Sequence, residues 1–202
     1  MCGATIIDDY WVLTAAHCAR GILDKAVVVL RKPTSNREII ITVKQAFVHP
    51  EYNNITAEND IAILKVSLTY KGIIPICLQK NDDILLKKDE GIVVGFGLSI
   101  RNATSSISIL ESTQALQITN VPLISHINCR KTWQAISFGT VKISDRQICA
   151  GSFMHGTAPG DSGGPLIVQN GFGDYIQIGV TSFGADGLSG LIDQGAYPGG
   201  YS

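Results

Sequence analysis

The sequence lacks the features that mark membrane and nucleic-acid-binding proteins. Its apolar runs, such as 39–41 and 92–94, are only as long as a strand, whereas a transmembrane helix needs about 20 apolar residues. The 202 residues include 16 basic and 17 acidic side chains, which give a net charge of -1, and they form no basic stripe or polybasic segment. We therefore expect neither a nucleic acid nor a membrane as a partner.

Cysteine pairs at the spacing of a metal site are also absent. The cysteines are too far apart for a CxxC zinc or redox motif, so we expect no metal; they are Cys2, Cys18, Cys77, Cys129 and Cys149. Pairing Cys2 with Cys18 and Cys129 with Cys149 would close short loops and imply an oxidising compartment, although the sequence permits other connectivities. Cys77 has no disulfide partner in this pairing.

The first residues, Met1-Cys2-Gly3, carry neither the charged region nor the apolar core of a signal peptide. The protein is therefore either cytosolic or given without its beginning. No internal repeat or low-complexity segment is evident.

Glycine and β-branched residues are abundant, and their pattern favours an all-β fold. The 21 glycines and frequent turns separate short apolar runs. We expect strands at 3–7, 10–13, 26–30, 38–48, 59–65, 91–97, 115–122, 148–151, 166–168 and 176–183. The polar stretch 78–90 is a candidate linker between two halves, 99–108 is expected to be a loop, and 125–133 a short helix capped by Ser125.

The hexapeptide Gly-Asp-Ser-Gly-Gly-Pro at 160–165 has the composition of a nucleophile loop. Glycines on both sides of Ser162 let the backbone and a substrate approach its hydroxyl closely. The N–H groups of Gly160 and Ser162 can then point at one spot beside that hydroxyl, where a negative oxygen would be stabilised. The alternative interpretation is a Gly-Pro turn before a strand.

Two further segments carry groups that would serve such a nucleophile. His17 follows small residues in Thr-Ala-Ala-His-Cys at 14–18, and Asp60 opens an otherwise apolar strand. His17 is either a catalytic base or a histidine buried in a short helical turn. Asp60 either ends an element or orients a histidine.

The order His17, Asp60, Ser162 differs from the order in subtilisins and in α/β-hydrolases. Together the three motifs closely resemble the chymotrypsin-like (trypsin-fold, peptidase S1) serine proteases over nearly the whole chain. Smaller matches support the resemblance at 2–3, 75–78, 95–97, 148–151, 182–184 and 198–201. It implies one peptidase domain of two antiparallel six-stranded Greek-key barrels, 1–82 and 83–202, with the active site in the cleft between them. We expect the family's first strand and C-terminal helix to be missing.

The resemblance also implies a role for each motif. Ser162 would attack the scissile carbonyl, His17 would take and return its proton, and Asp60 would orient His17. The N–H groups of Gly160 and Ser162 would form the oxyanion hole. The backbone of Ser182-Phe183-Gly184 would pair with the substrate as an added strand. This chemistry needs no metal or organic cofactor.

For the P1 residue, which precedes the scissile bond, the resemblance implies a pocket with its floor at Gly156 and its walls at Gly184 and Gly199. Three glycines predict an open, uncharged pocket that prefers apolar or aromatic side chains to Lys and Arg. Asp186 or Asp193 would change this preference if either reached in from the loop 185–196. A disulfide that is common in the family beside Ala158 has no cysteine at either end here.

Asp161 would be the acid that pairs, in the family, with an N-terminal amine freed when a zymogen is cleaved. We expect the chain as given to lack that terminus and to be poorly active, with Asp161 turned outward or protonated. The implied partners are protein or peptide substrates and protein protease inhibitors, and we expect a secreted monomer. The competing hypothesis is a non-catalytic relative that binds or regulates; retention of all three triad residues favours the enzyme.

Overall fold

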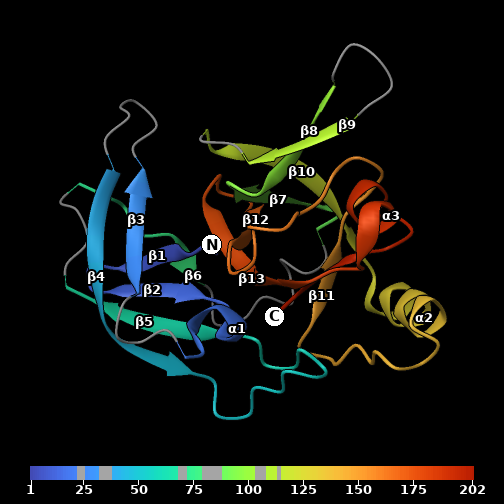
Figure 1. Cartoon of the computed structure of the whole chain (residues 1–202), viewed down its shortest axis with the longest axis horizontal. Helices are drawn as coiled ribbons and strands as arrows, with labels where there is room; N and C mark the ends of the chain where they lie inside the picture. The colour runs from blue at the N-terminus through green and yellow to red at the C-terminus, as the bar shows by residue number, and fades with distance from the viewer. Residues whose placement is uncertain (22–25, 32–37, 68–71, 79–87, 103–107, 113–114) are drawn as a thin grey trace.

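A computed structural model describes residues 1–21, 26–31, 38–67, 72–78, 88–102, 108–112 and 115–202. Strands dominate these residues and form two large sheets and one separate hairpin (Figure 1). The expected all-β class is confirmed.

The first sheet contains the segments that carry His17 and Asp60. Its described strands run in the antiparallel order β1-β2-β5-β4-β3. Their bounds are β1 Thr5–Asp8, β2 Trp11–Thr14, β3 Val27–Arg31, β4 Glu38–Val48 and β5 Ala62–Val66. Within the described residues the sheet is a curled half-barrel, since its edge strands β1 and β3 do not pair, and with the second sheet it is consistent with the expected two-barrel fold.

Side chains alternate across this sheet as the pleat requires. In β4, Ile41 and Val43 are buried on one face of the sheet, whereas Ile40, on the opposite face, is 68% exposed. Val12 of β2 and Val66 of β5 complete the buried cluster on the inner face. The pleat therefore decides which of these apolar side chains enter the core, since Ile39, Ile40 and Ile41 are consecutive in the sequence.

The second sheet closes into a barrel. Its order is β12-β7-β10-β11-β14-β13, and a further pairing of β12 with β13 joins the ends. The bounds are β7 Glu90–Gly95, β10 Gln117–Ile124, β11 Ile148–Ala150, β12 Pro165–Gln169, β13 Tyr175–Phe183 and β14 Gly199–Tyr201. The short strand β6 (Cys77–Leu78) pairs with β13 in parallel, an exception to the antiparallel pattern expected.

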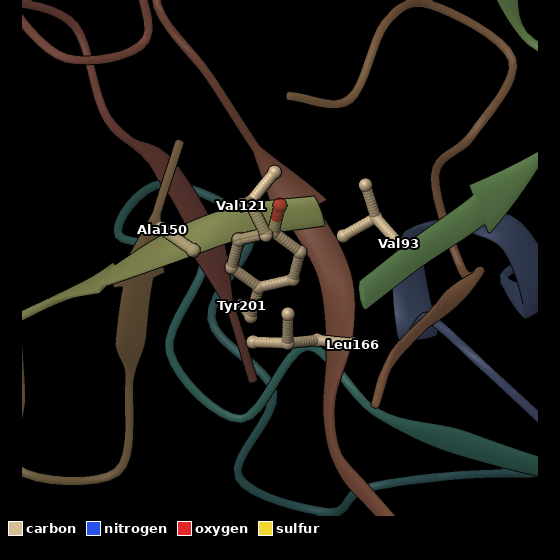
Figure 2. Close-up of a cluster of buried hydrophobic side chains, with 5 residues drawn as sticks. All are labelled: Val93, Val121, Ala150, Leu166 and Tyr201. Carbon is tan, nitrogen blue, oxygen red and sulfur yellow. The ribbon is translucent and has the colours of Figure 1, made fainter. Parts of the chain in front are cut away.

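A ring of buried side chains fills this barrel (Figure 2). Tyr201 lies among Val93, Val121, Ala150 and Leu166, which come from different strands, and none is more than slightly exposed. Each large apolar side chain that is buried contributes about 1.5–3 kcal/mol. The cluster fixes β14, and with it the glycines that immediately precede Tyr201.

The described helices are short. Helix α1 (Ala16–Ala19) follows β2 directly, and α2 (His126–Ile136) begins where it was expected, with the Ser125 hydroxyl accepting a hydrogen bond from the N–H of Asn128. Helix α3 (Gly187–Ile192) lies in the loop 185–196 and was not predicted. No helix in the described ranges has the length and apolar character needed to span a membrane.

The predicted loop at 99–108 is wrong over its described residues. Strands β8 (Leu98–Asn102) and β9 (Ser108–Ser112) form an antiparallel hairpin there. The alternation of Leu98 and Ile100 with polar neighbours is a strand pattern that the Ser/Thr/Asn-rich composition obscured. Most of the proposed linker 78–90 lies outside the described residues.

Candidate active site

His17 is held by its neighbours on both sides. Ala15 and Ala16 are fully buried, so the turn that leads from β2 into α1 packs tightly against the core. On the other side Cys18 forms a disulfide with Cys2, with 6.2 Å between their Cα atoms. The histidine does lie in a short helix, yet its side chain remains 34% exposed. The ring is therefore fixed at its base and accessible at its edge.

Asp60 lies just before β5, where it is buried and fully engaged. Its Oδ2 is 2.7 Å from Nδ1 of His17, and its Oδ1 accepts a hydrogen bond of 2.9 Å from the His17 backbone N–H. The hydroxyl of Ser182 donates to the same Oδ2 at 2.5 Å. These three contacts fix both the position and the face of the imidazole.

Burial alone would raise the pKa of Asp60. The hydrogen bonds from the His17 ring, from the Ser182 hydroxyl and from the His17 backbone outweigh this effect, so the pKa of Asp60 is lowered. The carboxylate is therefore charged at neutral pH although it is inaccessible to solvent. A buried negative charge beside Nδ1 favours the tautomer that carries its proton on Nδ1 and leaves Nε2 free to accept one.

Ser162 lies in a loop whose shape depends on glycine. Gly160 and Gly163 have φ of +103° and +84°, which disfavour a side chain. A Cβ at Gly163 would also overlap with the Thr14 hydroxyl and the Gly3 carbonyl oxygen. The Gly3 N–H donates to the carbonyl oxygen of Ser162 at 2.7 Å, so the loop is joined to the segment that precedes β1.

The structure brings Ser162 close to the histidine segment without a hydrogen bond from the Ser162 hydroxyl to His17. The Ser162 carbonyl oxygen is 3.6 Å from Cys18 Sγ, and the same sulfur is 3.4 Å from His17 Nε2. Hydrogen bonds between catalytic groups are often long without substrate and tighten when it binds.

Asp161 points inward beneath the same loop. Its Oδ1 accepts from the Gly97 N–H at 2.8 Å and its Oδ2 from the Ala158 N–H at 2.9 Å. Side chains at Gly95 or Gly97 would overlap with this carboxylate, which explains the Gly-Phe-Gly segment at 95–97. The sequence analysis expected Asp161 to turn outward or to bind a proton, and the outward turn is not observed.

Burial raises the pKa of Asp161, and the hydrogen bonds from Ala158 and Gly97 offset only part of this effect. Both donors are neutral backbone groups, and among the described residues no basic side chain pairs with the carboxylate. A cavity of about 240 Å³ adjoins it; its lining includes Gly97, Gly156, Thr157 and Leu191. The environment of Asp161 therefore favours the protonated form more than that of Asp60 does.

The segment 182–184, expected to pair with substrate through its backbone, has a second role. The Ser182 side chain is buried against Asp60, a contact that sequence analysis missed. The Phe183 ring packs edge-on to Trp133 with 5.1 Å between centroids. Apart from the two chain neighbours of Gly184, no heavy atom of the described residues lies within 4 Å of the position that its Cβ would take, so this wall is open.

The other two glycines of the predicted P1 pocket adjoin a residue that sequence analysis did not select. A Cβ at Gly156 would overlap with the side-chain amide of Gln194, and one at Gly199 would lie 3.1 Å from its Oε1. The Asp193 side chain accepts hydrogen bonds from the N–H groups of Gly195 and Ala196, and Asp186 is exposed. No motif marks Gln194.

The five cysteines form two disulfides and leave one free thiol. The second disulfide joins Cys129 of α2 to Cys149 of β11, with Cα atoms 6.0 Å apart, and Cys77 is exposed and unpaired. Cys2, His17 and Cys18 place their ligand atoms within 4.8 Å of one another. The two sulfurs of that group are bonded to each other, so they do not supply the thiolates that bind a metal.

Comparisons with known proteins agree with this arrangement. The sequence profile described as Trypsin matches residues 1–201. The chain belongs to the trypsin family. A relative described as Serine protease 28, from Mus musculus, is 27% identical over 197 residues, which cover 92% of this chain and 69% of the relative. Family membership and this relative support a serine protease, a chymotrypsin-like hydrolase of family S1.

Proposed function

We propose that this trypsin-family chain is a serine endopeptidase that uses Ser162, His17 and Asp60 as a catalytic triad. The observation that carries the proposal is the buried, charged Asp60, whose Oδ2 lies 2.7 Å from His17 Nδ1 beside the loop of Ser162. A carboxylate at this position orients an imidazole and stabilises its protonated form during catalysis.

In the proposed reaction the Ser162 hydroxyl attacks the scissile carbonyl while His17 Nε2 takes its proton. His17 then gives this proton to the leaving amine, and an acyl-enzyme on Ser162 remains. Water attacks the ester in the second half of the cycle, again with His17 as the base, and Ser162 is regenerated. Asp60 stays charged throughout, in keeping with its lowered pKa.

The backbone N–H groups of Gly160 and Ser162 form the oxyanion hole in this proposal. The positive φ of Gly160 and the anchoring of the Ser162 carbonyl to Gly3 support a fixed loop geometry. Donors fixed before the reaction stabilise the developing negative charge without reorganising. Asp161 supports this loop through its bonds to Gly97 and Ala158.

The proposed P1 preference is for uncharged, apolar or aromatic side chains. Among the described residues, neither Asp186 nor Asp193 directs a carboxylate to Gly156, so a Lys or Arg side chain would meet no counter-charge there. A buried cation without a partner is costly, which disfavours basic P1 residues.

The proposed setting is extracellular, with protein or peptide substrates and protein protease inhibitors as partners. The two disulfides support an oxidising compartment. Asn54, the first residue of an Asn-Ile-Thr sequon, is exposed in a turn, which suits a glycan. We propose a monomer, because His17, Asp60 and Ser162 all come from one chain, and activation from a zymogen, because Asp161 occupies the family's activation position.

Turnover of a peptide library by the whole protein tests the proposal. Ser162→Ala and His17→Ala should each lower kcat by several orders of magnitude. His126→Ala is a matched control, because His126 also faces an aspartate and its side chain is 33% exposed, against 34% for His17. Turnover that survives Ser162→Ala would overturn the assignment of Ser162 as the nucleophile. A wild-type protein that binds peptides without cleaving them after zymogen activation would favour the non-catalytic alternative.

A further inference from the structure

Gln194 is a buried polar residue for which the proposed mechanism has no use. It follows α3 in the loop 185–196, and only 4% of its surface is exposed. Its Oε1 accepts a hydrogen bond of 3.2 Å from the Thr157 N–H, and its Nε2 donates one of 2.5 Å to the Thr157 carbonyl. Such a paired contact holds the planar amide in one orientation.

This orientation places the amide against the pocket glycines. Gly156 and Gly199, two of the three residues expected to line the P1 pocket, both lie beside Oε1, and a side chain at Gly156 would overlap with the amide. A third glycine, Gly151, adjoins the Gln194 Cβ. The glycines thus leave room for Gln194, and part of the space they would offer to a substrate is already occupied.

The amide is also a source of hydrogen bonds at the pocket floor. Thr157 uses one lone pair of Oε1 and one hydrogen of Nε2, which leaves one acceptor site and one donor site on Gln194. Asp193, the nearest acid in sequence, accepts hydrogen bonds from the N–H groups of Gly195 and Ala196 instead. Of Asp193 and Gln194, it is Gln194 that directs its polar group to the pocket glycines, and this amide group is neutral.

We infer that Gln194 forms the floor of the P1 pocket and restricts it to short, uncharged P1 side chains. The inference rests on the proposed function and narrows the apolar or aromatic preference that the glycines alone suggest. Alanine- or serine-sized groups fit above the amide, and a serine hydroxyl can hydrogen-bond to it. A phenylalanine ring would have to displace the amide from Thr157, and two backbone hydrogen bonds would then be lost.

Peptidyl phosphonates that differ only at P1 test the inference in the whole protein. They react with the catalytic serine, so the second-order rate of labelling at Ser162 reports P1 acceptance directly. The wild type should react faster with a P1 alanine probe than with P1 phenylalanine or P1 arginine. Gln194→Ala should raise the phenylalanine-to-alanine ratio roughly 10-fold or more, since one methylene in a pocket is already worth this much discrimination.

Gln194→Glu provides a second variant of nearly the same shape, in which the Thr157 N–H can still donate to the side chain whereas the hydrogen bond to the Thr157 carbonyl is lost. It places a carboxylate beside Gly156 and should raise the arginine-to-alanine ratio roughly 10-fold, because Arg pairs with carboxylates through two hydrogen bonds. Gln147→Ala is the matched control. Gln147 is 3% exposed and likewise accepts from one backbone N–H and donates to one carbonyl, at Ser144 and Ala57. Its loss should leave both ratios unchanged.

A small fluorophosphonate without a P1 side chain distinguishes a failure of the Gln194 inference from a failure of the proposed function. If it labels Ser162 in folded wild type and variants but the P1 ratios do not change, the role of Gln194 is wrong and the proposed function stands. If it fails to label Ser162 in wild-type protein activated by zymogen cleavage, the proposed function is refuted and the inference falls with it. A wild type that prefers P1 phenylalanine to alanine would overturn the inference alone.

Discussion

Asp60 is buried beside His17, and Asp161, within the nucleophile loop, is half-buried; the environments of the two carboxyl groups differ. Asp60 receives hydrogen bonds from an imidazole, a hydroxyl and a backbone N–H, and its pKa is lowered. Asp161 receives two backbone N–H groups at similar distances, and its pKa is raised. Burial acts in the same direction on both.

The difference shows that hydrogen-bond geometry alone does not decide the charge of a buried carboxyl. Asp60 has one more donor than Asp161, and one of its partners, His17, also interacts with it electrostatically. Two neutral N–H groups do not offset the desolvation of Asp161. We therefore expect Asp60 to act through its charge and Asp161 through the position of its loop, and each of the following variants tests one side of this comparison.

The largest effect is expected for Asp60→Asn, which should lower kcat by about 10⁴ because the amide stabilises the wrong tautomer of His17. The measurement is kcat on a peptide substrate. Asp145→Asn is the matched control, since Asp145 also pairs with a histidine, His126, and with Arg130, and its side chain is largely exposed. A loss of less than tenfold in Asp60→Asn would contradict the role of its charge.

A smaller loss is expected for Asp161→Ala. Removing the carboxylate frees the N–H groups of Gly97 and Ala158 and loosens the loop that presents the Gly160 N–H. Loss of one oxyanion donor costs about 10²–10³ in kcat, and we expect a loss in this range. The same kinetic assay applies, and KM should change less than kcat. A loss as large as that of Asp60→Asn would remove the distinction between the two aspartates.

Stability should depend on pH in opposite ways for the two residues. The pKa of folded Asp60 is lowered, so its contribution is present above the unfolded value of about 3.9 and is lost as pH falls through the folded value. The pKa of folded Asp161 is raised, so its contribution is present below about 3.9 and is lost as pH rises through the folded value.

Denaturant unfolding over a pH series measures this difference. Relative to wild type, Asp60→Asn should flatten the loss of stability on the acid side, and Asp161→Asn should flatten the loss that occurs as pH rises. Asp145→Asn again serves as the exposed control. If the stabilities of Asp60→Asn and Asp161→Asn depend on pH in the same way, the pKa values of Asp60 and Asp161 are not shifted in opposite directions.

The smallest effect is expected for Ser182→Ala. It removes one of the hydrogen bonds that lower the pKa of Asp60, so that pKa should rise while His17 keeps its partner. A tenfold loss in kcat corresponds to about 1.4 kcal/mol, and we expect no more than this. Ser189→Ala, at an exposed position in α3, should have no effect. A loss larger than that of Asp161→Ala would make Ser182 essential to the triad.

Much of the fold could be predicted because its signals are local. The apolar, β-branched residues of 38–48 located the long strand there, and Ser125 marked the start of α2 as an N-cap does. Closure of the second sheet was expected only from the family resemblance, because it depends on pairings between segments distant in sequence, such as β12 with β7, as well as on the hairpin of β12 and β13; the first sheet remains open among its described strands. Composition also misled at 99–108, where polar residues form a hairpin.

In the candidate site, too, residues in local motifs could be predicted, whereas residues brought in by the fold could not. His17, Asp60 and Ser162 lie in motifs whose residue types carry the chemistry, so the sequence pointed to them directly. Ser182 was selected only for its backbone, because nothing in Ser-Phe-Gly reveals that its hydroxyl faces Asp60, 122 residues earlier. Gln194 carries no signal at all; its place beside Gly156 follows from how the loop 185–196 folds back on Thr157.

The central claim, that Asp60 and His17 activate Ser162, is tested most directly by mapping a fluorophosphonate adduct and measuring its rate of formation. The account predicts a single adduct on Ser162 in the wild type, none in Ser162→Ala, and much slower labelling in His17→Ala and Asp60→Asn than in Asp161→Ala. An adduct on another residue, or equal labelling rates in the wild type and Asp60→Asn, would contradict it.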